Sequence, residues 1–175
     1  MNDTSKTVVC FVADFKYLYK HFSRIYEQLR NKGNYKGEVL IITNQLTPTF
    51  LIKQIRQRFG VTVIRFRKLK FDNATEKSLR NINSVPNRHN TKNFQWHKLY
   101  LFHEKMKKWR YVFYFDINMS IHDNINLILD VKPANQIFAR ADGYPRYVWK
   151  LESQFDKSHP KFKKLSRKFD LDRND

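Results

Sequence analysis

The sequence predicts an α/β fold with a Rossmann-like, mostly parallel sheet. Short apolar runs bounded by polar residues alternate with longer segments of helical periodicity along the 175 residues. Strands separated by helices of this length form right-handed crossovers, so neighbouring strands run in the same direction. Numbering the strands along the chain, we expect the spatial order 3-2-1-4. The expected strands are 8–13, 38–43, 61–66, 111–115 and 136–140.

Two amphipathic helices are expected between the first three strands. Asp14 is placed to cap the first helix, which we expect to begin near Tyr17 and to end at Lys32-Gly33. Pro48 opens the second helix and Gly60 ends it. Their apolar stripes are Tyr17, Phe22, Ile25, Tyr26 and Leu29 in the first, and Phe50, Leu51, Ile55 and Phe59 in the second.

Composition indicates one globular domain, because 41% of the residues are hydrophobic and the length suffices for a core. The formal net charge of +18 would attract polyanions, although Lys- and Asn-rich codon usage explains such an excess equally well. A lone Cys10 in an expected core strand fits a reducing compartment. No apolar run is long enough to span a membrane, and Met1 leads almost directly into a strand, so we expect a cytoplasmic protein.

Two basic segments stand apart from the alternating pattern. Residues 67–93 have little periodicity, and we expect a flexible basic loop there, of the kind that forms lids or binding loops. Its candidate phosphate contacts are Arg80, Arg88, His89 and Lys92. Residues 144–175 end in a basic amphipathic helix candidate. We expect that segment to pack on its own domain or to lie on an anionic membrane surface.

The stretch from Phe94 to Asp123 combines a helix, a strand and an acidic turn. The expected buried face of the helix is Trp96, Leu99, Phe102 or His103, and Met106, with Lys98 outside that face. The apolar run 111–115 is typical of a strand buried on both faces. Asp116 and Asn118 follow this strand directly, and open α/β sheets bind ligands beyond the carboxyl ends of their strands.

These motifs, in this order, resemble the nucleotide-sugar glycosyltransferases of the GT-A fold, most nearly the glycogenin-like family 8 branch. The similar residues are Trp96-His97-Lys98-Leu99, Tyr114-Phe115-Asp116-Ile117-Asn118, Ile125 and Leu127, and the resemblance covers roughly the first 145 residues. It implies transfer of a sugar from a UDP- or GDP-sugar to an unknown sugar, protein or lipid acceptor, with retention of configuration. It also implies Mn²⁺ or Mg²⁺ held by Asp116 and Asn118.

The resemblance assigns further donor contacts, each with a plainer alternative. Lys98 matches the lysine that faces the phosphates, and Tyr17 matches an aromatic residue that stacks on the base. Their alternatives are an exposed helix lysine and a core tyrosine. Ala13 and Asp14 would contact the base or ribose, although Asp14 also suits a helix cap, and Asp142 would contact the sugar. Asp116 and Asn118 have the alternative of shaping a turn, and His122 and Asp123 are spare ligands or helix-entry residues.

Two departures from the family pattern bear on activity. Asn118 stands where the family has a second carboxylate, so metal affinity should fall. The family's later strand with its Asn, and a further metal ligand, have no counterpart before Asp175. We therefore expect a truncated chain, a minimal donor-binding half or an inactive scaffold as alternatives to a working transferase. A basic module that binds nucleic acid or a membrane surface is the remaining alternative.

Overall fold

The structure is a computed structural model that describes residues 7–83, 92–130, 137, 160–161 and 163–164. The chain divides into two compact units, where the length alone predicted one domain. The first unit comprises residues 1–69 and 92–134, and the second comprises residues 70–91 and 135–175. No helix among the described residues is long and apolar enough to cross a membrane.

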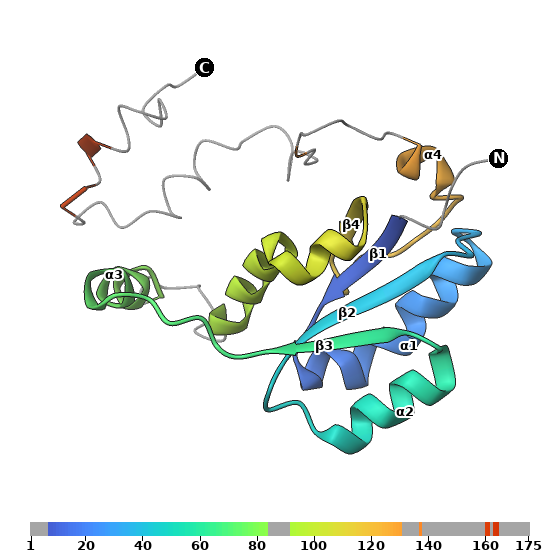
Figure 1. The fold of residues 1–175 in the computed structure, drawn as a ribbon, viewed down its shortest axis with the longest axis horizontal. Helices are drawn as coiled ribbons and strands as arrows, with labels where there is room; N and C mark the ends of the chain where they lie inside the picture. Colours follow the sequence, from blue (N-terminus) through green and yellow to red (C-terminus); the bar gives the residue numbers. More distant parts are fainter. Residues whose placement is uncertain (1–6, 84–91, 131–136, 138–159, 162, 165–175) are drawn as a thin grey trace. The chain divides into compact units, whose positions relative to one another are not determined.

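The first unit is built on a four-stranded, all-parallel sheet in the order β3-β2-β1-β4, which confirms the predicted order (Figure 1). The strands are β1 (Thr7–Val12), β2 (Glu38–Asn44), β3 (Thr62–Phe66) and β4 (Tyr111–Phe115). β1 and β2 are almost entirely buried, as predicted for central strands of a parallel sheet. Cys10 lies within β1, and burial raises the pKa of its thiol, so it behaves as a small apolar residue.

The first layer over the sheet consists of α1 (Phe15–Asn31) and α2 (Thr49–Phe59) (Figure 1). As predicted, Asp14 caps α1, and its Oδ1 accepts a hydrogen bond from the backbone N–H of Tyr17 at 2.9 Å. Gly60 ends α2 in the left-handed conformation, with φ of 62°, which glycine adopts without steric cost. The buried helix residues are Leu18, Phe22, Ile25 and Leu29 of α1 and Leu51, Ile52 and Ile55 of α2.

Two members of the predicted apolar stripes are exposed instead. Tyr17 is 41% exposed and Phe50 is 68% exposed, while their neighbours Leu18 and Ile52 are buried. α1 begins at Phe15, two residues earlier than expected, and its buried row is Leu18, Phe22, Ile25 and Leu29, so Tyr17 lies outside that row. The plainer reading of Tyr17 as a core residue is therefore wrong.

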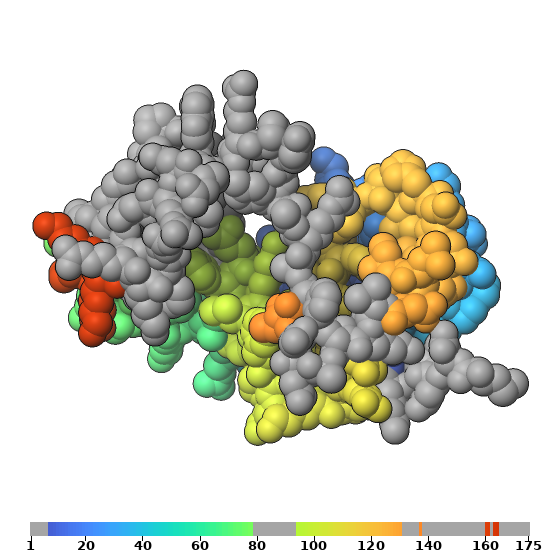
Figure 2. Space-filling model, turned by 90° about the horizontal axis from the view of Figure 1, so that it is seen from above, coloured from blue at the N-terminus to red at the C-terminus, as the bar shows by residue number. Residues whose placement is uncertain are grey.

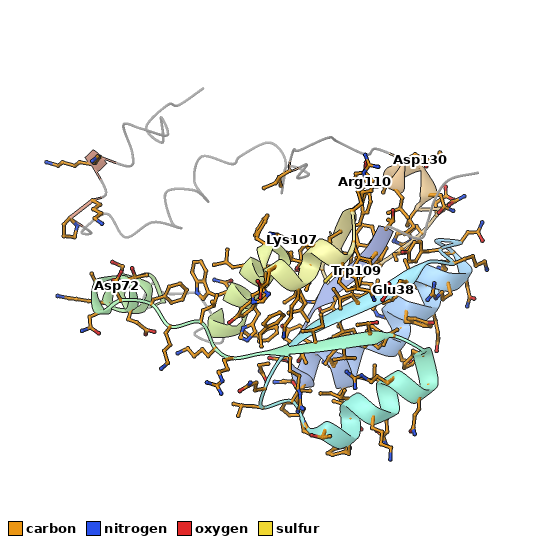
Figure 3. All side chains as sticks on the ribbon, viewed as in Figure 1. Glu38, Asp72, Lys107, Trp109, Arg110 and Asp130 are labelled. Atoms are coloured by element: carbon orange, nitrogen blue, oxygen red, sulfur yellow. The ribbon has the colours of Figure 1, made fainter. Side chains whose placement is uncertain are left out.

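The second layer covers the other face of the sheet, and its helices are not α-helices. It comprises the 3₁₀ helices η2 (Lys92–Phe102) and η3 (Glu104–Lys108), and Figure 2 looks down onto this side of the sheet. Met106 and Trp109 are buried against the apolar side chains of β1 and β2. The Trp109 indole N–H donates to Glu38 Oε2 at 2.7 Å and fastens this layer to the start of β2 (Figure 3).

The predicted buried face of the 94–106 helix is wrong at Leu99 and Phe102, whereas Met106 is buried and Trp96 and His103 are half-buried. Leu99 and Phe102 are 47% and 67% exposed, and His97 is 2% exposed. A 3₁₀ helix has three residues per turn, so side chains three apart lie directly above one another. The row that faces the sheet is Phe94, His97 and Tyr100, not the equally spaced row of Trp96, Leu99 and Phe102, and Tyr100 stacks on Phe66 with ring centroids 4.0 Å apart.

The segment 67–93, predicted to be a flexible loop, contains α3 (Asn73–Asn83) in the second unit. Asp72 caps it by accepting a hydrogen bond from the backbone N–H of Thr75 at 2.7 Å. Hydrogen bonds from Thr75 lower the pKa of Asp72, as expected for a capping carboxylate. An acidic cap followed by Glu76 in the first turn is an ordinary start signal for a helix. The polar composition of residues 67–93 concealed helix α3 from the sequence prediction.

The region after β4 completes the described part of the first unit. β4 is half-buried along its whole length, because it is the outermost described strand on its side of the sheet, and the prediction of burial on both faces is wrong. A turn then leads to the short helix α4 (Asn126–Leu129), within residues 124–129, where the sequence predicts a short helix. The predicted fifth strand 136–140 lies outside the described residues apart from Ile137, and the described residues of 144–175 are too few to test the predicted basic helix.

Candidate functional site

The candidate site lies where β1 and β4 end side by side. The two strands pair in parallel, with Cys10 opposite Tyr114 and Phe11 opposite Phe115. Because of this register, the turn that begins at Ala13 and the turn that begins at Asp116 leave the same edge of the sheet. The predicted strand order 3-2-1-4 places these two turns side by side, and the fold confirms that order.

Asp116 opens a tight turn that its own side chain helps to shape. The N–H of Met119 donates to the Asp116 carbonyl at 3.0 Å, and the N–H of Asn118 donates to Asp116 Oδ1 at 3.3 Å. Ile117 points into the core and is 2% exposed, which anchors the turn, while Asn118 is exposed. The turn-forming role considered for Asp116 is thus real, and it leaves Oδ2 for other contacts.

Lys98 brings a positive charge to that second oxygen. Its Nζ lies 3.4 Å from Asp116 Oδ2, and both side chains are about half exposed, at 44% and 47%. The same Nζ lies 5.2 Å from the centre of the Tyr114 ring. Burial alone would lower the pKa of Lys98, but the adjacent Tyr114 and Asp116 outweigh it and raise the pKa. Lys98 therefore stays charged at neutral pH.

The first layer holds in place the loop that follows Asp116, residues 117–121, which we call the Asp116 loop. Arg24 of α1 donates to Ser120 Oγ at 3.2 Å and to the Met119 carbonyl at 3.4 Å. Gln28, one turn further along α1, accepts from the N–H of Ile121 at 3.0 Å. These contacts join residues more than ninety positions apart, so the loop has a fixed path across α1.

The β1 side of the site presents its predicted residues in three different ways. Ala13 is buried, and its N–H donates to the Ile42 carbonyl at 3.0 Å. Asp14 is half-buried and uses Oδ1 for the cap of α1. Tyr17 is exposed one turn further on, with its ring 5.6 Å from that of His21. Tyr17 is thus free to lie against a flat ligand, whereas the Ala13 side chain is not.

Asp116 and Asn118 suit a hard divalent cation as part of its ligand set. In the part of the chain that the structure describes, no three His, Cys, Asp or Glu side chains gather as a complete metal site. Mg²⁺ ions are commonly bound through one or two carboxylates, with substrate phosphates and water completing the shell. One half-exposed carboxylate beside an exposed amide fits that pattern.

Several other predicted contacts lie elsewhere or outside the description. His122 and Asp123 are exposed in the loop before α4, where Asp123 Oδ1 accepts from the N–H of Asn124 at 2.6 Å. This fits the helix-entry role considered for them. Asp142, Arg88 and His89 lie outside the described residues, as do the side chains of Arg80 and Lys92.

Tyr114 is a site residue that the sequence prediction missed. Its hydroxyl is buried and makes no hydrogen bond of standard geometry to the described residues. Burial raises the pKa of Tyr114, and the nearby Lys98 charge only partly offsets this, so the phenol stays protonated. The alternation of side chains along β4 was the available signal, because it turns Tyr114 toward the second layer. Arg24 and Gln28 gave no such signal, since polar residues on an exposed helix flank are common.

Models of known protein families were searched with this sequence, and none matches it. A search of curated proteins also found no significant match.

Proposed function

We propose that the chain binds a UDP- or GDP-sugar at the β1–β4 edge and acts as a glycosyltransferase of the GT-A type. The observation that carries the proposal is the contact between Lys98 Nζ and Asp116 Oδ2 at 3.4 Å, at the carboxyl end of a parallel sheet. The motif resemblance had assigned these two residues, eighteen positions apart, to one diphosphate. That they meet across two different elements supports the assignment.

The chemistry asked of these residues is stabilisation of a leaving group. Negative charge grows on the diphosphate as its bond to the sugar breaks, and fixed cations nearby lower that barrier. The raised pKa of Lys98 keeps its ammonium group charged for this role. A Mn²⁺ or Mg²⁺ ion held by Asp116, Asn118 and the diphosphate would supply further electrophilic stabilisation of the same charge. Tyr17 is exposed in a position to stack on the base.

The test is calorimetric titration of UDP, GDP and their glucose, galactose and mannose conjugates, with and without Mn²⁺. We expect one nucleotide to bind in a Mn²⁺-dependent manner. Asp116→Asn should remove the Mn²⁺ dependence, and Lys98→Gln should weaken binding about tenfold or more, since a hydrogen bond to a charged group contributes about 1.5–3 kcal/mol.

Matched controls are Glu104→Gln and Lys107→Gln, which remove a carboxylate and an ammonium group at exposed positions outside the site. Both should bind like the unaltered chain. Equal affinity of Asp116→Asn and Glu104→Gln would exclude Asp116 as a ligand. A chain that binds donor but neither hydrolyses nor transfers its sugar would be an inactive scaffold of the same ancestry.

A further inference from the structure

A cationic groove runs along β3, on the opposite edge of the sheet from β4. It has a volume of about 670 Å³ and is bordered by α2, β3 and η3. Figure 1 shows β3 at this edge, with α2 on one side and the turns of η2 and η3 on the other. None of its lining residues belongs to the site at Asp116.

The groove is lined by four cations and no carboxylate. Lys53 and Arg56 come from α2, Arg65 from β3 and Lys105 from η3, and all four are exposed. None of them forms an ion pair within the described part of the chain. Cations that line one groove from three elements, and form no ion pair with the described residues, create a positive potential that favours an anionic ligand.

Two of these cations are already held in place by neutral groups. Arg56 donates to the Val63 carbonyl at 2.7 Å, and Arg65 donates to Thr49 Oγ1 at 3.4 Å. Neither contact consumes charge, so both guanidinium groups keep donors for a ligand. The Arg56 contact also occupies a carbonyl of the edge strand, which disfavours the addition of a peptide strand there.

The floor of the groove is apolar. Ile52 and Val63, which belong to the core under α2, are 5% exposed at its base, and Ile64, which faces the second layer, is half-buried. A small inorganic ion would leave such a floor uncovered, whereas a phosphate ester attached to a hydrocarbon chain would contact both the cations and the floor. The groove volume also falls in the range of ordinary small-molecule sites.

We propose that the β3 groove binds the phosphate ester of a lipid-like molecule. The phosphate lies among Lys53, Arg56, Arg65 and Lys105, and the first part of its apolar chain lies on Ile52 and Val63. This site is independent of the donor site, which lies beyond the ends of β1 and β4.

The probe is dihexanoyl phosphatidic acid below its micellar concentration, titrated by calorimetry into the full chain. We expect it to bind at least about tenfold more tightly than inorganic phosphate and dihexanoyl phosphatidylcholine. The test variant is Lys53→Gln combined with Lys105→Gln, because Arg56 and Arg65 also serve the fold. It should lose about tenfold or more in affinity.

The matched control is Lys32→Gln combined with Lys36→Gln, which removes the same charge at exposed positions outside the groove. It separates a local site from the general attraction of a chain with net charge +18. Equal weakening by both pairs would overturn the proposal, and so would equal affinity for inorganic phosphate. Asp116→Asn should leave this binding unchanged, so failure here and failure of the donor assignment are distinguishable.

Discussion

The two layers that cover the sheet are built on different principles. The layer of α1 and α2 has capped α-helices whose buried side chains pack with Val9, Phe11 and Ile41 of the sheet. The layer of η2 and η3 follows a three-residue period and contacts the sheet largely through aromatic rings. Among the described residues, four buried side-chain atoms lack a hydrogen bond of standard geometry: both ring nitrogens of His97 and the Tyr114 hydroxyl belong to this second side, and the fourth is Thr7 Oγ1 at the start of β1.

The difference between the two layers separates the residues that stabilise the fold from those that form the candidate site. Locally inconsistent features in natural proteins tend to concentrate at functional sites. Here, unsatisfied polar groups lie beside Lys98, the residue that reaches Asp116, while the first layer is apolar at its core. We infer that the first layer contributes most of the packing energy and that the second positions the candidate site.

The largest expected effect is therefore in the first layer. Phe22→Ala removes a ring that is 1% exposed and packs edge-on against Phe11 and Phe59, at centroid distances of 6.0 and 5.3 Å. We expect a loss of about 3–5 kcal/mol in the free energy of unfolding, measured by urea denaturation.

Tyr19→Ala is the control for this substitution. Tyr19 lies on the same helix but is 81% exposed, so its removal should change stability by about 0.5 kcal/mol or less. Similar losses for both variants would show that α1 is not packed as described.

An intermediate effect is expected at the joint between the second layer and β2. Trp109→Phe removes the 2.7 Å hydrogen bond to Glu38 and should cost about 1.5 kcal/mol at pH 7, the low end for a bond to a charged group because Glu38 is partly exposed. Burial would raise the pKa of Glu38, but the hydrogen bonds from Trp109 and Thr62 and the charge of Lys108 lower it overall.

The sign of the pH dependence follows from that lowered pKa. The stabilising contribution of the Glu38 carboxylate is fully present above the usual glutamate pKa of about 4.5. It is lost as the pH falls through the lower pKa that Glu38 has in the folded state. Urea unfolding at pH 7 and near pH 3 should therefore show the gap between Trp109→Phe and the unaltered chain narrowing in acid. If the difference in free energy of unfolding between the two chains did not change with pH, Trp109 would not stabilise the fold through its hydrogen bond to Glu38.

The same contrast explains what could be predicted from the sequence. The strand order, the Asp14 cap and the Gly60 stop follow from local signals that the first layer obeys. The meeting of Lys98 and Asp116 was expected from the motif resemblance.

What was missed depends on information that a helical period does not contain. The predicted row of Trp96, Leu99 and Phe102 already had a spacing of three residues, and its phase was wrong: the row of η2 that faces the sheet is Phe94, His97 and Tyr100. The contacts of Arg24 and Gln28 with the Asp116 loop depend on tertiary placement across more than ninety residues. No local pattern encodes them.

The smallest expected effect probes the polar group inside the second layer. His97 stacks on Phe94 with ring centroids 4.3 Å apart. Burial lowers its pKa below the usual 6.5, and the nearby Phe66 and Phe94 carbonyls only partly offset this. Below pH 6.5 the unfolded chain takes up a proton that the folded chain resists, so stability falls as the pH falls.

His97→Leu should remove that sensitivity. At pH 7.5 we expect little change in the free energy of unfolding, and at pH 5.5 the variant should gain up to about 1 kcal/mol relative to the unaltered chain, since one unit of pKa difference corresponds to about 1.4 kcal/mol. His122→Gln, at an exposed position, is the control and should leave the pH profile unchanged. If His97→Leu gains acid stability but loses nucleotide affinity, His97 is kept for the site that Lys98 forms rather than for the fold. If its pH profile matches that of the control, His97 does not resist protonation, and the contrast between the two layers would rest on Tyr114 alone.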